Sequence, residues 1–439
     1  MTGSDLARVG AFTAACLLVS NAVGSGIFTT TGFLARDLGS EAWILGLWLL
    51  GGVLALAGAL SYAELGAALP RVGGEYVYLR RAFGPLAGFL SGWTSFALGF
   101  GGAIAASAAA FAAYLQRLAP TLAEWDAAWI GVVLVWSITA VHLLGVEASG
   151  RFQRAVTVLK IAPILVGVGL AFVVGGDTAE TPGLATAEPR FGAAAVGLVF
   201  VLYSFSGWNA ASYIAGEMRD PARSLPLALV GGTVFVTALY LAVNVVYFAA
   251  LPVSALGADP VLPVAEKSAR ALFGGDAARV VVAVLCVSIA GSVSSMVWAG
   301  PRVTLAMAED GALPASLGGT TSGGAPLVAT LLQSVWVTLL LFTGTFEQIV
   351  VYAGVALAIF GALAVACVPA LRRGEPALER PFRTPGYPWV PIAFVAASLW
   401  TASYAAVERP VEALLSLGTV SLGIPLFFWA RRRAAAPDA

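Results

Sequence analysis

Long apolar runs separated by short polar connections dominate the chain, and their lengths predict membrane-spanning helices. A helix of about 20 apolar residues crosses the hydrocarbon core of a bilayer. Hydropathy along the chain predicts twelve such spans. They cover residues 9–38, 41–68, 86–116, 127–147, 152–176, 192–217, 226–250, 279–308, 325–344, 348–371, 388–406 and 411–430. We therefore expect an all-α polytopic membrane protein with 12 transmembrane helices, in a single domain over residues 1–439.

Two of the predicted spans carry a glycine–serine interruption near the middle. Gly24-Ser25-Gly26 lies at the centre of the first run, which is longer than a bilayer requires, and Tyr203 to Asn209 interrupts the run at 192–217. Glycine weakens a helix and tolerates the backbone angles of a break. Inside a membrane, freed main-chain groups are tolerated only where they line a cavity. We predict two broken helices that share a polar site at mid-membrane depth; the alternative is that these residues only allow close helix packing.

Composition agrees with a membrane protein and excludes several other classes. The chain is 59% hydrophobic and 11% charged, with a mean hydropathy of +0.88, whereas soluble chains are roughly a quarter charged. The formal net charge is zero, so no nucleic-acid partner is expected. The three cysteines lie in apolar runs and look like packing residues. We expect no metal site and no cofactor.

Basic residues are distributed unevenly between the two sides of the predicted spans. Sixteen of the 24 Lys and Arg residues fall on one side and seven on the other, while Lys160 falls inside a span. Cytoplasmic loops carry the excess of positive charge. We therefore expect a multi-pass protein of the plasma (inner) membrane with both termini cytoplasmic.

Carboxylates and arginines also gather at the span ends on this predicted cytoplasmic side. The carboxylates are Glu64, Glu147 and Glu217, with Arg71, Arg151 and Arg219 as expected neighbours. They read either as salt bridges of an intracellular gate or as solvated helix ends.

Main-chain groups at the two breaks match the two charged groups of one small molecule. A half-helix that starts at Ser25, Gly26 and Ile27 presents free N–H groups and a positive dipole end, which suit a carboxylate. The preceding half-helix leaves carbonyls that suit an ammonium group. These carbonyls belong to Ala22 and Val23, and the second break adds those of Tyr203, Ser204 and Phe205. An α-amino acid carries both groups on adjacent atoms, so we predict that it binds here.

Four motifs in chain order carry a resemblance to a known family. They are Gly24-Ser25-Gly26-Ile27-Phe28; Gly207-Trp208-Asn209 followed by Glu217-Met218 and Asp220–Pro226; Arg302 with Ala306–Pro314; and Arg380-Pro381-Phe382-Arg383 through Pro388 and Pro391. Together they resemble helices 1, 6 and 8 and the loop before helix 11 of the amino acid–polyamine–organocation (APC) superfamily, and in particular its L-type amino acid transporter branch. The resemblance spans nearly the whole chain.

The resemblance implies a LeuT-like fold of two inverted five-helix repeats, here 9–176 and 192–371, with two extra helices at 388–430. Helices 1 and 6 are the unwound ones in such transporters. The aromatic residue before the helix 6 break acts there as an outer gate, and Tyr203 occupies that position. The alternative for Tyr203 is an aromatic side chain packed between helices.

Lys160 lies nine positions into its predicted span, too deep for a surface charge. A buried ammonium must find carbonyls or lose its proton. The resemblance implies that this lysine replaces a sodium ion that related transporters hold between helices 1 and 8. We expect Lys160 to bond the carbonyls near Ala22 and Val23 and to couple protonation or substrate binding to helix tilt. The alternative is that it extends toward Arg154 and the cytoplasm.

The two breaks are flanked by no Asp or Glu, and Asn209 supplies a neutral amide where relatives that carry cationic amino acids can have a carboxylate. The alternative for Asn209 is an amide that only packs between helices. We therefore predict secondary active transport of neutral L-amino acids by alternating access, sodium-independent, as a proton symporter or exchanger. The alternative within the superfamily is a cationic amino acid or polyamine antiporter. A membrane-embedded enzyme or a channel is disfavoured, because the sequence shows no nucleophile–base pair, no metal-binding helix and no pore loop.

The expected partners are the amino acid, protons and the lipid bilayer. Eukaryotic L-type light subunits usually carry a cysteine between helices 3 and 4 that ties them to a heavy subunit. The stretch 116–126 has none, so no disulfide-linked heavy subunit is expected.

Overall fold

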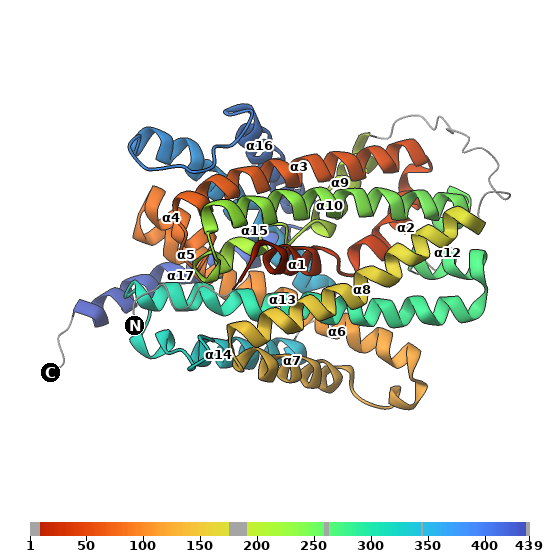
Figure 1. Cartoon of the computed structure of the whole chain (residues 1–439), viewed down its shortest axis with the longest axis horizontal. Coiled ribbons are helices and arrows are strands. Elements are labelled where there is room, and N and C mark those ends of the chain that lie inside the picture. The colour runs from red at the N-terminus through yellow and green to blue at the C-terminus, as the bar shows by residue number, and fades with distance from the viewer. Residues whose placement is uncertain (1–8, 175–190, 259–262, 344–345, 436–439) are drawn as a thin grey trace.

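The computed structural model describes residues 9–174, 191–258, 263–343 and 346–435, and these form a helical assembly (Figure 1). Apart from two isolated β-bridges, this part of the chain contains no extended pairing. In chain order the elements are α1 (Ala11–Ala22), α2 (Gly26–Leu38), α3 (Glu41–Ala68), α4 (Glu75–Phe83), α5 (Pro85–Thr94), the π-helical η1 (Ser95–Phe100), α6 (Gly101–Leu118), the 3-10 turn η2 (Pro120–Leu122), α7 (Ala127–Leu143), α8 (Val146–Val174), α9 (Phe191–Ser204), the 3-10 helix η4 (Ala210–Glu217), α10 (Pro221–Ala250), α11 (Val253–Leu256), α12 (Val264–Phe273), α13 (Gly275–Glu309), the 3-10 turn η5 (Ala315–Gly318), α14 (Leu327–Thr343), α15 (Phe346–Gly374), α16 (Trp389–Glu408) and α17 (Pro410–Ala435).

Nine candidate spans in the described part of the chain are long and apolar enough to cross a membrane. Three shorter apolar helices, α7, α9 and α14, lie within the predicted spans 127–147, 192–217 and 325–344. The prediction of an all-α protein with many membrane spans is thus confirmed. Most predicted boundaries lie within a few residues of a helix end, but α8 begins at Val146 rather than 152, and α9 ends at Ser204 within the span predicted at 192–217. The span predicted at 86–116 is built from α5, η1 and α6 in succession.

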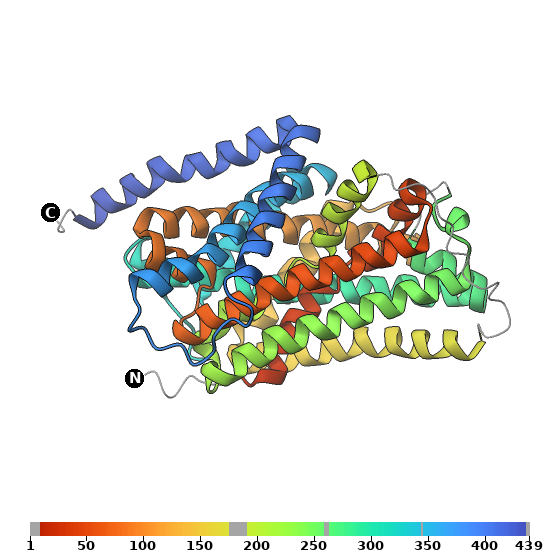
Figure 2. The ribbon, with the colours of Figure 1, turned by 90° about the horizontal axis from the view of Figure 1, so that it is seen from above.

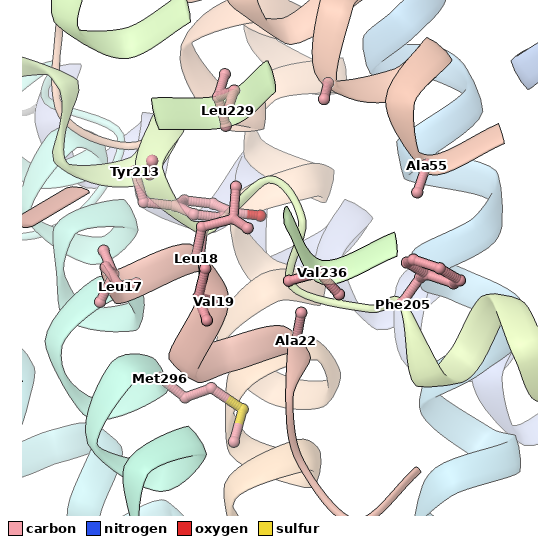
Figure 3. Packing of buried hydrophobic residues seen from close by; sticks show 14 of the residues in the cluster. Leu17, Leu18, Val19, Ala22, Ala55, Phe205, Tyr213, Leu229, Val236 and Met296 are labelled. Atoms are coloured by element: carbon pink, nitrogen blue, oxygen red, sulfur yellow. The ribbon is translucent and has the colours of Figure 1, made fainter. Parts of the chain in front are cut away.

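Helix α1 lies in the interior of the bundle, and its apolar side chains are enclosed on several sides. Leu17 and Leu18 are fully buried. Figure 3 shows the residues that surround this helix in the core. They include Ala55 of α3, Leu229 and Val236 of α10, and Met296 of α13. The short first helix is therefore held by the long helices around it.

Glycines allow α3 to lie against α9 and α10, as Figures 1 and 2 both indicate. A Cβ on Gly52 would lie 2.3 Å from the Thr237 side chain of α10, and a Cβ on Gly51 would lie 2.4 Å from Val201 of α9. Small residues commonly bring membrane helices into such close contact, since apolar burial alone does not drive helices together in lipid.

The chain segment just before α1 is joined to the end of η4 by main-chain hydrogen bonds. The Val9 N–H donates to the Glu217 carbonyl at 3.0 Å, and the Arg219 N–H donates to the Val9 carbonyl at 2.8 Å. Figure 1 shows α4 and the last turn of α17 at this same end of the long axis, and α12 at the opposite end.

Ion pairs at the α4 end differ from those that neighbouring sequence positions suggested. Glu64 lies 2.6 Å from Arg372 and 3.6 Å from Arg380, and it accepts a hydrogen bond from the Thr384 N–H at 2.7 Å. Arg71, expected near Glu64, instead pairs with Asp310 at 2.9 Å. Distant segments meet here, so proximity in sequence did not identify the partners.

The partner of Glu217 also differs from the expected Arg219. Its Oε1 pairs with Arg302 of α13 at 2.8 Å, and the Arg302 side chain is 1% exposed. Arg302 also donates to the Trp298 carbonyl. This pair fastens the end of η4 to α13.

We predict that Glu64→Gln lowers the stability of the protein by about 3 kcal/mol, because breaking a buried ion pair leaves the remaining charges uncompensated. Thermal unfolding in detergent, followed by tryptophan fluorescence, measures the loss. Glu379→Gln, at an exposed position of the same region, is the matched control and should unfold as the wild type does. Equal unfolding of the two variants would contradict this role of Glu64.

Candidate functional site

The first interruption separates α1, which ends at Ala22, from α2, which begins at Gly26. Val23, Gly24 and Ser25 lie between them, and the Gly24 N–H turns back to the Ala22 carbonyl at 2.8 Å. In this described segment the N–H groups of Ser25, Gly26 and Ile27 have no hydrogen-bond partner. The first N–H groups of a helix carry the positive end of its dipole. The start of α2 can therefore bind an anion.

The second interruption separates α9, which ends at Ser204, from η4, which begins at Ala210. Gly207 has φ 95°, a value that favours glycine, so the turn depends on this residue. The carbonyls at and just after the end of α9 already accept hydrogen bonds from the main chain. Tyr203 O accepts from Ser206 N at 2.9 Å, and Phe205 O accepts from Trp208 N at 3.3 Å. A carbonyl has two lone pairs, so each can still accept one further donor.

The two interruptions lie against each other, and two glycines make this approach possible. A Cβ on Gly26 would lie 2.5 Å from Ser204 Oγ, and a Cβ on Gly207 would lie 2.7 Å from Asn21 Cγ. Thr30 Oγ1 and Ser204 Oγ share a hydrogen bond at 2.9 Å. Gly24, Ser25, Gly26 and Gly207 remain half-buried in a region that is otherwise packed. The arrangement brings free donors beside main-chain acceptors.

Tyr240 of α10 bridges the two interruptions, a role that the sequence analysis missed. Its hydroxyl donates to Ala22 O at 2.7 Å and to Ser204 O at 2.9 Å, in a shared hydrogen bond. The side chain is fully buried, and Trp48 packs edge-on against its ring with 5.1 Å between centroids. A tyrosine in an apolar run carries no distinctive signal, although most buried tyrosine hydroxyls find a hydrogen-bond partner.

Lys160 of α8 lies where the C-terminal end of α1 meets the middle of α13. Its Nζ donates to Ser20 O at 2.6 Å, to Val23 O at 2.7 Å and to Ser288 O at 3.3 Å. The side chain is fully buried. The expected contact with Val23 is present, whereas the Ala22 carbonyl is bonded by Tyr240 instead. The ammonium thus ties three helices together through main-chain acceptors.

The alternative for Lys160, extension toward Arg154, is not what the structure shows. Arg154 lies one and a half turns earlier in α8 and donates to Thr13 Oγ1 at 2.8 Å. Ser292 of α13 completes the cluster at the end of α1, since its Oγ donates to Ser20 O at 2.8 Å. The carbonyls that the sequence analysis assigned to a substrate ammonium are therefore bonded by the protein's own donors.

The aromatic residues at the second interruption differ in their burial. Tyr203 is 38% exposed at the last turn of α9. Phe205 is 1% exposed and packs against Tyr240, with 5.0 Å between ring centroids. Of the two, only Tyr203 is accessible at the end of α9.

Asn209 contacts a carboxylate that the sequence analysis did not place near the site. Its Nδ2 donates to Glu75 Oε1 at 2.9 Å, and to the Tyr213 hydroxyl at 3.3 Å. No acidic residue flanks either break in sequence, but α4 folds back under the second one. The two residues are 134 positions apart, so only the tertiary structure could reveal the contact.

Comparison with known proteins identifies the family. The family model described as "Amino acid permease" matches residues 9–415. The chain belongs to the amino acid permease family. It is 28% identical to the "Serine/threonine exchanger SteT" of Bacillus subtilis (strain 168), over 98% of each chain. The permease is thus a multi-pass membrane protein of the APC superfamily, related to the L-type branch.

Human relatives show a range of substrates. The permease is 27% identical to the human "Large neutral amino acids transporter small subunit 2", over 96% of this chain and 80% of that one. It is 26% identical to the human "Cystine/glutamate transporter", over 94% of this chain and 83% of that one. Both names describe transporters of amino acids, but the amino acids that they name differ in their side chains.

We predict that Tyr240→Phe slows amino acid transport about tenfold, because Ser204 O loses its donor and Ala22 O keeps only the Gly24 N–H, and an unsatisfied buried acceptor costs roughly 1–3 kcal/mol. Transport in liposomes measures the effect. Tyr247→Phe is the matched control, since the Tyr247 hydroxyl is 3.4 Å from Ile27 O and bonds it weakly. A Tyr240→Phe variant as fast as this control would refute the bridging role.

Proposed function

We propose that the permease is a sodium-independent secondary transporter of neutral L-amino acids that works by alternating access as an exchanger or proton symporter. In this proposal it lies in the plasma (inner) membrane with both termini cytoplasmic, and works without a disulfide-linked heavy subunit. Its helices form two inverted repeats, 9–176 and 192–371, followed by two extra helices at 388–430. Family membership and the two adjoining helix interruptions support this assignment.

The observation that carries the proposal is the set of free N–H groups at Ser25, Gly26 and Ile27, beside the second interruption. The substrate carboxylate binds these donors, as anions bind at helix N-termini. The first interruption's carbonyls are bonded by Lys160 and Tyr240. The substrate ammonium therefore uses the second lone pairs of the carbonyls at Tyr203, Ser204 and Phe205. Tyr203 closes the site from outside.

The contacts of Lys160 support the proposed sodium independence. A sodium ion at the junction of α1, α8 and α13 would need the main-chain oxygens of Ser20, Val23 and Ser288, and the lysine ammonium already bonds all three. The fixed cation holds the end of α1 in place of a diffusible one. Transport should then not require sodium.

The hydrogen bonding of Glu75, the carboxylate that contacts Asn209, supports a preference for neutral side chains. Oε1 of Glu75 accepts hydrogen bonds from Tyr62 at 2.6 Å and from Asn209 at 2.9 Å, so neutral donors already occupy this oxygen. A cationic amino acid or polyamine antiporter is the alternative that the experiment must include.

Purified permease in liposomes loaded with unlabelled amino acids tests the function. We expect labelled serine, threonine, alanine or leucine to accumulate by counterflow, without sodium, while arginine, glutamate and putrescine do not. Empty liposomes and protein-free liposomes are the controls. Counterflow of arginine or putrescine alone would replace the neutral assignment with the cationic one, and absence of counterflow for every substrate would refute amino acid exchange.

We predict that Lys160→Met reduces this counterflow roughly a hundredfold, because Val23 O loses its strongest donor, Ser20 O keeps only Ser292 Oγ, and the end of α1 loses its fixed position. Lys267→Met is the control. Lys267 bonds only carbonyls of the α11 region, such as Ala258 O at 2.7 Å. Wild-type rates in Lys160→Met would remove this lysine from the mechanism.

A further inference from the structure

Glu75 occupies the interior of the protein although it begins a short helix between two spans. Gly73 and Gly74 precede it with φ 111° and 53°, and the Gly73 N–H donates to Tyr213 O at 3.0 Å. A Cβ on Gly74 would lie 2.7 Å from the Tyr213 ring. The glycine pair thus lets the chain pass directly beneath η4. Glu75 is only 4% exposed as a result.

Neutral donors from three elements surround the Glu75 carboxylate. The Tyr62 hydroxyl of α3 donates at 2.6 Å and Asn209 of the second interruption donates at 2.9 Å. The Tyr213 hydroxyl of η4, which accepts from Asn209 Nδ2 at 3.3 Å, also faces the carboxylate. Separation of η4 from α3 and α4 would break these bonds and admit water. The hydration of Glu75 is therefore tied to the position of the chain that follows the second interruption.

Other buried carboxylates of the protein have a cationic partner. Glu64 pairs with Arg372, Glu217 with Arg302, and Glu266 with Arg117. Within the part of the chain that the structure describes, Glu75 pairs with no Lys or Arg. A buried carboxylate without a cation is costly in its ionised form.

The titratable groups that face Glu75 are all neutral at physiological pH. They are Tyr62 of α3, Tyr78 of α4, Tyr213 of η4 and Cys367 of α15. Burial raises the pKa of Glu75, and the polar groups of Tyr62, Asn209 and Tyr213 that face the carboxylate offset this only in part. A raised pKa means that the packed conformation binds a proton more tightly than a hydrated one. Lower pH therefore favours the packed state, and higher pH favours its opening.

Lys160, the other buried ionisable group near the interruptions, is suited to a different task. Its ammonium has three main-chain acceptors. Loss of its proton would remove one of the three N–H donors that hold these carbonyls. Glu75 can gain or lose a proton while keeping its neutral neighbours, so it is the better carrier.

We propose that Glu75 binds the proton that accompanies the amino acid. It takes a proton from external water that reaches the second interruption, holds it while α3, α4 and η4 enclose it, and releases it to cytoplasmic water when they separate. One proton is bound and one is released, and no covalent bond to a heavy atom changes. The inference rests on the proposed function and selects proton symport as its coupled mode.

Liposomes that contain a trapped pH dye test this inference. With the wild type and an acidic exterior, we expect added serine to acidify the interior and to accumulate. Glu75→Gln should lose amino acid-dependent acidification and accumulation at least tenfold, while counterflow at symmetric pH remains measurable and no longer varies with pH. Glu375→Gln is the matched control, since it breaks only a surface pair with Arg81, and it should acidify like the wild type.

The outcomes distinguish failure of the Glu75 proton site from failure of the proposed amino acid transport. Counterflow by the wild type without acidification would overturn the proton site and leave amino acid exchange standing, whereas no counterflow would refute both. Acidification by Glu75→Gln at the wild-type rate would also overturn it. If Glu75→Gln does not fold, Tyr62→Phe provides the test. This variant removes a donor to the Glu75 carboxylate, so the pKa of Glu75 should rise and the pH midpoint of uptake should move upward by about one unit. An unchanged midpoint in Tyr62→Phe counts against Glu75.

Discussion

Main-chain groups freed by a helix break inside an apolar environment must find partners, and the centre of this permease is built around that requirement. Lys160 from α8, Tyr240 from α10 and Ser292 from α13 supply donors to the carbonyls that end α1. Three long helices thus hold one short one by its C-terminal end. Among the described residues, the N–H groups that begin α2 receive no such partners. The anion-binding group therefore stays open, whereas the carbonyls at the end of α1 are occupied.

The second interruption lies between two polar clusters of different character. On one side Tyr240 fixes the end of α9 through Ser204 O, so this half-helix is bound to the surrounding helices. On the other side Asn209 bonds Glu75, which begins a short helix after a glycine turn. The end of α9 is thus held by the hydroxyl of a long helix, and the segment that leads into η4 by a protonatable group.

The sequence predicted the features that depend on local composition. Run length gave the membrane spans, and Gly24, Ser25, Gly26 and Gly207 marked where helices stop, because glycine acts on the backbone at its own position. Lys160 was found because its charge is costly in an apolar run. Tyr240 and Glu75 were missed, since their importance arises from contacts across more than a hundred positions. The partners of Glu64 and Glu217 were assigned wrongly for the same reason.

The main-chain pairing of Val9 with the end of η4 has a consequence for how motion could be observed. Two backbone hydrogen bonds on either side of Val9 make the start of the described chain and the segment at Met218 move as one piece. A spectroscopic probe attached just ahead of α1 would then report displacement of η4, without any label inside the transport pathway.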